Sequence, residues 1–265
     1  MVTSRIVQER CNPDQLILGI EEYRHFHSYV KDKFLPRPHV SLIFHFGDRP
    51  SVFNDTEIRL ESFFVVPIIS HAVILGFDGH MDTFVVNCRP TVFSKLFDID
   101  LSKSTAQRVK LSNQLFFPLW RELRSLGNKQ SRAACFSKFV ETLAPVYTPD
   151  AVDQLYDKIV ERGMNTSLKS LMDECNSSKS TLLRRFISRT GVCPKTLMRI
   201  VRLNHLWKTV RDLNEKIDFQ EMAYQGNYFD QAHFINDFKS IIGETPGSFF
   251  RRNLNDVRIL SGKQN

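Results

Sequence analysis

The spacing of hydrophobic residues changes partway along this chain of 265 residues. Between residues 40 and 86, Val, Ile and Phe gather in short runs separated by Gly, Pro and Asp, which is the pattern of β-strands and their turns. The expected strands are Val40–Phe46, Phe63–Val66, Ala72–Phe77 and Thr83–Val86. Strands this short and this closely spaced predict a small antiparallel barrel or sandwich. Residues 1–39 show no regular pattern, and we expect them to be irregular.

After Pro90 the hydrophobic residues recur at helical spacing. We expect helices at Thr91–Phe97, Phe117–Leu126 and Ser131–Leu143, the second with Pro118 near its first turn. The last two helices should form an antiparallel pair that completes the β-rich part of the chain.

The two prolines of Ala144–Pro149 mark a domain boundary. The predicted fold class is α+β, with a β-rich regulatory domain over residues 1–144, an all-α domain over 148–253 and a polar tail over 254–265. Thr148 is expected to cap the first helix of the α domain, with Pro149 at its first position and Gly163 at its end.

The segment from Ser167 to Arg252 contains an internal repeat. Each copy predicts a capped helix, a short turn, a second capped helix and a closing glycine within a Gly-x-x-Pro sequence. The expected helix caps and closing glycines are Ser167, Ser178 and Gly191 in the first copy, and Asp218, Asp230 and Gly243 in the second. Asp218 and Glu221 have the spacing of a capping box, and Gly226-Asn227 supplies the second turn. Two short helices around a tight turn are the layout of a helix-turn-helix unit.

A basic helix is expected to join the two units, over Pro194–Leu213. Its twenty residues would span about 30 Å, which is close to one turn of B-DNA, roughly 34 Å. Residues 179–211 hold nine Lys or Arg and no acidic residue, and residues 151–265 hold 18 basic and 13 acidic residues, so +5 of the net charge of +7 lies there. This charge asymmetry favours a nucleic-acid partner.

The helical segment resembles the DNA-binding domain of the AraC/XylS transcription regulators. The resemblance lies in LLRRFISRTGVCPK, in RIVRLNHLWKTV and above all in YFDQAHFINDFKSIIGETPGSFFRR. Three positions depart from the family pattern, because Asn176 and Asn227 stand where a Gly is usual and Phe229 replaces a small polar cap. The resemblance implies a cytoplasmic regulator that binds double-stranded DNA and works without a cofactor, and it leaves open whether this regulator is an activator or a repressor. It further implies a small-molecule effector, contact with RNA polymerase and a homodimer.

The family pattern also assigns roles to single residues. Arg binds guanine and Gln or Asn binds adenine in a bidentate manner, whereas Lys and Arg on the flanks contact phosphates. The residues expected to read bases are Ser180, Leu183 and Arg184 in the first unit, and Gln231, Ala232, His233 and Asn236 in the second. The residues expected to contact phosphates are Lys179, Lys195, Arg199, Arg251 and Arg252.

Two other functions for this chain stay open. Gly19, His25, His27 and Asp32 partly resemble the first metal motif of the cupins, although His39 stands where that motif ends in Gly. This favours, as an alternative, a metal-dependent cupin-type enzyme fused to a DNA-binding tail. A ligand-independent architectural DNA binder is the third reading. No motif of a hydrolase or a nucleotide-dependent enzyme occurs, so we expect no catalysis.

The remaining composition points to a protein without disulfides or membrane anchors. Its five cysteines are odd in number and scattered, which favours reduced thiols. The N-terminus lacks the pattern of a signal peptide, and no apolar run is long enough to span a membrane. Five aromatic residues of the β-rich part either line a ligand pocket or belong to an ordinary core, and base rates favour the core. They are Phe44, Phe46, Phe63, Phe64 and Phe77.

Overall fold

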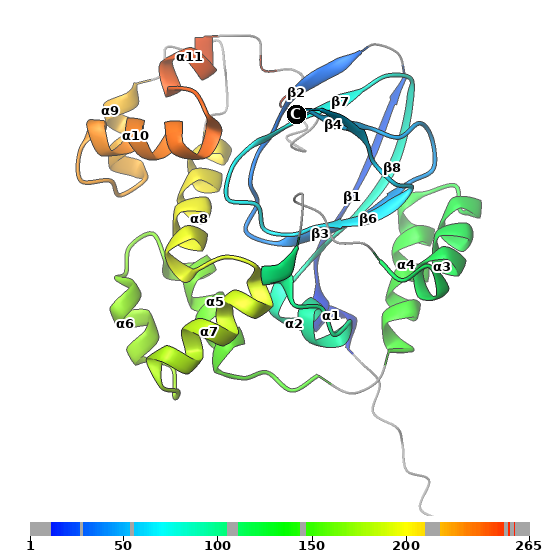
Figure 1. The fold of residues 1–265 in the computed structure, drawn as a ribbon, viewed down its shortest axis with the longest axis horizontal. Coiled ribbons are helices and arrows are strands. Elements are labelled where there is room, and N and C mark those ends of the chain that lie inside the picture. Colours follow the sequence, from blue (N-terminus) through cyan, green and yellow to red (C-terminus); the bar gives the residue numbers. More distant parts are fainter. Residues whose placement is uncertain are drawn as a thin grey trace, which may run out of the picture.

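A computed structural model describes residues 12–26, 29–53, 56–104, 111–143, 147–209 and 218–251, together with 254 and 257. A β-rich N-terminal domain is followed by a helical C-terminal domain (Figure 1). The β domain has two antiparallel four-stranded sheets, in the orders β1-β8-β3-β6 and β2-β7-β4-β5, which do not close into a barrel. Of the two architectures expected, the sandwich is therefore found. The strands are β1 (Ile17–Phe26), β2 (Val30–Phe34), β3 (Val40–His45), β4 (Ser51–Phe53), β5 (Glu57–Arg59), β6 (Phe63–Val66), β7 (Val73–Phe77) and β8 (His80–Cys88).

The expectation that residues 1–39 are irregular is wrong, because β1 and β2 lie there, after a short helix α1 (Pro13–Leu16). β1 carries acidic side chains that hide its pattern in the sequence. Glu21 accepts a hydrogen bond from Arg37 at 3.0 Å, and Glu22 accepts one from Arg132 at 2.7 Å. These partners lie far along the chain, so a local pattern cannot reveal that the acids are satisfied inside a sheet.

One face of the first sheet packs on helices. Leu42 and Phe44 of β3 and Phe84 of β8 are fully buried against Phe93, Phe116 and Phe136 of these helices. These helices are α2 (Pro90–Leu96), α3 (Asn113–Ser125) and α4 (Lys129–Glu141), and Figure 1 shows α3 and α4 side by side. Burial of each such side chain contributes about 1.5–3 kcal/mol. Helix α3 begins four residues earlier than expected, with Pro118 inside it.

Arg132 fastens α4 to the edge of this sheet. Its side chain is buried and donates to Glu22 and Asp82, and to the carbonyl oxygens of Leu123 and Leu126 at the end of α3. Burial acts to raise the pKa of Asp82, but the hydrogen bonds from Arg132 together with the positive charges of Arg132 and Arg24 outweigh it and hold that pKa below its ordinary value. The helix pair is thus held by a paired charge as well as by apolar packing.

The C-terminal domain is built from seven helices in the described residues: α5 (Ala151–Arg162), α6 (Leu168–Asp173), α7 (Lys179–Thr190), α8 (Pro194–Thr209), α9 (Phe219–Gln225), α10 (Gln231–Ile242) and α11 (Pro246–Arg251). The expectation that Thr148 caps the first of them is wrong. Asp150 is the cap, and it forms a reciprocal capping box with Asp153. The expected end at Gly163 is confirmed.

Candidate nucleic-acid interface

The first helix-turn-helix unit consists of α6 and α7. The hydroxyl of Ser167 accepts the backbone N–H of Ser170 at 3.1 Å, as expected for a cap. Helix α7 follows Ser178 and ends at Gly191, whose φ of 82° is the left-handed conformation that glycine adopts without strain. Leu182 and Phe186 form its apolar face and are buried in one cluster with Leu171 of α6 and Leu197 of α8. The unit therefore has the layout that the sequence predicts.

The expected base-reading residues of the first unit differ in exposure. Ser180 and Arg184 are exposed on the N-terminal half of α7. Leu183 is half-buried and packs against the core of the unit. Ser180 and Arg184 are thus free to approach a groove, whereas Leu183 mainly completes the core, and its contact with a base stays a prediction.

The second unit consists of α9 and α10. Asp218 accepts the backbone N–H groups of Gln220 and Glu221, and Asp230 accepts that of His233 at 2.7 Å, so both expected caps are confirmed. Asn227 has a φ of 51°, the left-handed conformation that the turn requires, and Gly243 closes α10 in the same conformation. The core of this unit is aromatic, built around Trp207, Tyr228, Phe234, Phe238, Phe249 and Phe250.

The expected base-reading residues of the second unit all lie on the surface. Gln231, Ala232 and His233 form the first turn of α10, and Asn236 stands in the second turn. All four are exposed. This is the half of a recognition helix that usually enters the major groove.

The residues expected to contact phosphates differ in their surroundings. Lys195 and Arg251 are exposed, whereas Arg252 lies outside the described residues. Lys179 forms a surface ion pair with Asp173 at 2.6 Å. Arg199 has an internal role, because it donates to the buried carboxylate of Asp237 at 2.5 Å and so joins α8 to α10. A phosphate contact by Arg199 stays a prediction and would compete with that ion pair.

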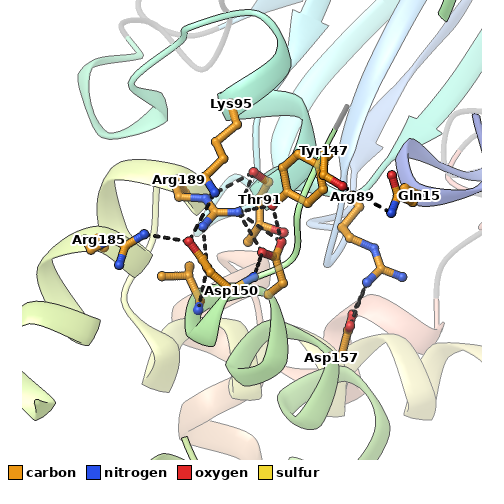
Figure 2. Close-up of polar contacts among 11 residues, drawn as sticks. Gln15, Arg89, Thr91, Lys95, Tyr147, Asp150, Asp157, Arg185 and Arg189 are labelled. Carbon is orange, nitrogen blue, oxygen red and sulfur yellow. Dashed lines mark hydrogen bonds and ion pairs between the residues drawn. The ribbon is translucent and has the colours of Figure 1, made fainter. Parts of the chain in front are cut away.

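The C-terminal end of α7 is attached to the β domain through Arg189, which is only 6% exposed (Figure 2). Its guanidinium donates to the carbonyl oxygen of Thr91 at 2.8 Å, to Asp150 at 2.7 Å and to Asp153 at 2.9 Å. The hydroxyl of Tyr147 donates to Asp153 at 2.6 Å. Because Thr91 belongs to α2, this cluster connects the first recognition helix directly to the N-terminal domain.

Further ion pairs surround this cluster (Figure 2). Asp150 also accepts from Arg185 at 2.5 Å and from Lys95 at 3.2 Å. Burial acts to raise the pKa of Asp150, but the positive charge of Arg189 and the hydrogen bonds from Val152, Arg189 and Lys95 together outweigh it and hold that pKa below its ordinary value. Asp150 therefore remains ionised at neutral pH and can neutralise the surrounding cations.

The C-terminal end of α10 is attached to the other sheet. Lys33 of β2 donates to the carbonyl oxygen of Ile242 at 2.7 Å and pairs with Glu244 at 2.8 Å. The backbone N–H of Ala72 donates to the carbonyl oxygen of Ile241 at 2.8 Å. A cation at the last carbonyls of a helix complements the helix dipole. The β domain thus contacts the C-terminal ends of both recognition helices and leaves their N-terminal halves exposed.

The sequence did not reveal either attachment. Arg189 belongs to the basic run that we assigned to DNA, and Lys33 lies in the segment expected to be irregular. Both side chains find their partners in the other domain, and in neither case does the spacing along the chain indicate it.

Within the described part of the chain, no group of three His, Cys, Asp or Glu side chains is placed to hold a metal ion. Asp32 lies on β2, where its carboxylate accepts the N–H of Lys33. His27 and the side chain of His25, the other two candidate ligands of that motif, lie outside the described residues. None of the described helices is both long and apolar enough to cross a membrane.

The comparisons with known proteins agree with this geometry. Residues 171–252 match the family described as a helix-turn-helix domain, and residues 19–110 match a domain of unknown function (DUF6597). Among curated proteins, none matches the sequence of this chain.

The chain is similar to solved structures of ToxT from Vibrio cholerae over most of its length. One is 12% identical with a TM-score of 0.49 and covers 88% of this chain and 97% of its own. Another, bound to (E)-4-(8-methylnaphthalen-1-yl)but-3-enoic acid, is 12% identical with a TM-score of 0.48 and covers 92% and 99%. A third, bound to an unsaturated fatty acid, is 13% identical with a TM-score of 0.43 and covers 91% and 96%. Likenesses of this degree carry no argument about function. The family match and the two units of α6–α7 and α9–α10 nevertheless agree with each other: residues 171–252 form a helix-turn-helix domain of the AraC type, and the resemblance to the AraC/XylS regulators is confirmed.

Proposed function

We propose that this chain is a sequence-specific transcription regulator that reads two successive major grooves of DNA and is controlled through its β domain by a small molecule. It works in the cytoplasm by binding, not by catalysis. One observation carries the proposal. In both units the N-terminal half of the recognition helix is exposed and bears polar side chains, while its C-terminal end is held by the rest of the protein.

The two recognition helices are separated by α8, which has 16 residues and spans about 24 Å. The link continues through residues 210–217, outside the described part, before Asp218 begins the second unit.

Selection from a random pool of double-stranded DNA tests the proposal. We expect the full chain to enrich one sequence with two half-sites about one helical turn, or 10–10.5 base pairs, apart. The titration is then repeated at several salt concentrations, because phosphate contacts make affinity fall steeply with salt. Enrichment of no sequence, with binding that depends on salt alone, would contradict sequence-specific regulation and favour the architectural binder.

The second face of the first sheet is the candidate effector site. Residues on β3 and β8 alternate, so those between the helix-facing Leu42, Phe44, Phe84 and Val86 point toward the other sheet. This inner face is polar. Ser41 donates to Asn87 at 3.0 Å and Asn87 donates to Glu21 at 2.7 Å, and His45 lies 2.8 Å from the hydroxyl of Thr83.

Two histidines of this region are poised for a ligand. Burial lowers the pKa of both His39 and His45 to about 3, so both are neutral at physiological pH. Among the described residues, neither Nε2 atom has a hydrogen-bond partner. A buried polar atom without a partner costs about 1–3 kcal/mol. A small polar organic molecule between the sheets would satisfy the Nε2 atom of His45, whereas His39 lies at the opposite end of β3. Of the five aromatic residues of the β-rich part, Phe44 and Phe63 belong to the core against the helices, which is the interpretation that base rates favour.

Thermal melts with a panel of small polar metabolites test this site. A compound that binds only the folded protein raises the melting temperature. We expect at least one compound to do so for the wild type and not for His45→Phe, whereas His71→Ala, on the exposed surface, behaves as the wild type. Loss of the fold on treatment with a chelator would favour the cupin enzyme instead.

The proposal includes two further partners that the resemblance to the AraC/XylS regulators implies, a second copy of this chain and RNA polymerase. Leu115 and Phe117 on α3 are partly exposed, and Phe117 stacks on Trp120 at 5.9 Å, which supports a homodimer formed through this helix. Sedimentation of the wild type and of Phe117→Glu measures it, and only the wild type is expected to dimerise. Contact with RNA polymerase stays a prediction.

A further inference from the structure

Phe229 is an apolar side chain that the fold leaves in water. It is 92% exposed, more than any other large hydrophobic residue of the described part of the chain. It directly precedes Asp230, the cap of the second recognition helix. A phenylalanine left exposed forgoes about 1.5–3 kcal/mol of stabilisation by burial. Its position next to the DNA-reading end of α10 suggests what it is for.

The usual structural role of this position is filled by a different residue. A hydrophobic residue before the cap commonly packs on the fourth residue of the helix, here Phe234, and fixes the entry of the chain. In this unit the ring of Tyr228 packs on Phe234 instead, with ring centroids 5.4 Å apart, and its hydroxyl donates to Asp237 at 2.9 Å. Phe229 is therefore not needed for the fold of the unit.

The neighbours of Phe229 in sequence are the residues assigned to base reading. Gln231, Ala232 and His233 are exposed in the first turn of α10, and the carboxylate of Asp230 is occupied by the backbone of His233. A recognition helix enters the major groove by this end. The apolar feature that base edges present there is the methyl group of thymine, and phenylalanine is one of the side chains that contact it.

We propose that Phe229 is a specificity-determining residue that contacts a thymine methyl group at the edge of the half-site read by α10; this inference rests on the proposed function. The first unit has Ser177 at the matching place, directly before its cap Ser178. Thymine recognition of this kind is therefore a property of the second half-site alone.

The test uses the full chain and the DNA site that it enriches from a random pool. Each thymine of that site is replaced in turn by deoxyuridine, which lacks only the methyl group. We expect one such replacement in the second half-site to weaken binding by the wild type about fourfold, the effect of removing one buried methyl-sized group. Phe229→Ala should bind the thymine and deoxyuridine probes equally, and Phe229→Leu should keep part of the difference.

Tyr224→Ala is the matched control, because Tyr224 is 82% exposed on α9 of the same unit and outside the recognition helix. It should discriminate thymine from deoxyuridine as the wild type does. The inference is overturned if Phe229→Ala keeps the wild-type discrimination, or if the second half-site contains no thymine whose methyl group matters. It is also overturned if Phe229→Ala binds all probes normally but no longer activates transcription, since the ring then serves a protein partner. A wild type that enriches no DNA at all contradicts the proposed function itself.

Discussion

The two helix-turn-helix units follow one plan but are stabilised differently. The first has a mainly aliphatic core around Leu171, Leu182, Leu197 and Ile200, and the second has a cluster of aromatic rings around Phe238. Phe238 lies within 5.5–5.8 Å of the rings of Phe234, Phe249 and Phe250. The two units thus share their closing glycines while their cores differ, because a core needs only apolar volume and the right pattern.

The two units also differ in how they join the β domain. The first uses Arg189, a buried cation held by Asp150, Asp153 and a carbonyl oxygen of α2. The second uses Lys33, which is about one-fifth exposed, and one backbone hydrogen bond from Ala72. The first attachment therefore depends on ionised groups in a buried site, and its loss should affect the protein more than loss of the second.

The largest expected effect follows from removing Arg189. Arg189→Met leaves the carboxylate of Asp153, which is 3% exposed, without its cation. Breaking a buried pair by removing one partner costs about 3–5 kcal/mol. We expect the free energy of unfolding, measured by urea titration, to fall by that amount.

Two variants calibrate this result. Arg185→Ala removes a half-exposed cation from the same Asp150 and should cost no more than about 1 kcal/mol. Lys33→Met, in the attachment of the second unit, should fall between the two. If Lys33→Met destabilises as much as Arg189→Met, the contrast between the two attachments is wrong.

Acid should weaken the first attachment. The pKa of Asp150 is lower in the folded protein than its ordinary value, about 3.9 in an unfolded chain. Its contribution to stability is therefore fully present above pH 4 and is lost as the pH falls through the lower, folded value. Asp157 of the same region acts in the opposite sense, because burial raises its pKa. Urea titrations of the wild type and Asp150→Asn between pH 2 and 5 should converge toward low pH. A constant difference between them across this range would show that the charge of Asp150 is not what stabilises the cluster.

The sequence predicts most of the helical domain because its signals are local. Ser167, Asp218 and Asp230 cap the helices that immediately follow them, and Gly191 and Gly243 end helices in a conformation that their own backbone allows. The exposed positions of the proposed readers follow from the same helical periodicity.

The sequence does not predict the features that depend on distant partners. Arg189 and Thr91 are separated by 98 residues, and Lys33 and Ile242 by 209. β1 was missed because its acids are neutralised by Arg37 and Arg132 from other elements. In each case a charged side chain looks like a surface residue until the fold supplies its counter-charge.

After the stability effects of Arg189 and Asp150, the next largest expected effect is on base preference. It compares the proposed base-reading residues of the two units. Truncating a base-reading side chain costs about 1–3 kcal/mol at its own base pair. Arg184→Ala should therefore relax preference in one half-site, and Gln231→Ala in the other, about one helical turn away. Binding titrations against single-base variants of the selected site measure this.

Lys195→Ala is the control for these variants, since Lys195 is exposed at the start of α8 and is proposed to contact a phosphate. It should weaken binding to all sequences alike and reduce the slope of log affinity against log salt by about one. If Arg184→Ala and Gln231→Ala also weaken all sequences alike, the assignment of the two readers is wrong.

The smallest expected effect compares the caps of the two recognition helices. Asp230 accepts the backbone N–H of His233 at 2.7 Å, whereas the side chain of Ser178 makes no capping hydrogen bond to α7. Replacing an engaged cap by alanine costs about 1 kcal/mol, because a backbone donor of the first turn loses its partner and the favourable negative charge near the helix dipole disappears. Asp230→Ala should therefore lower the free energy of unfolding by about 1 kcal/mol, and Ser178→Ala by only a few tenths. Urea titrations resolve the two if the slopes stay equal. Equal losses in both variants would mean that Ser178 caps α7 in solution, and that the two units begin their recognition helices in the same way.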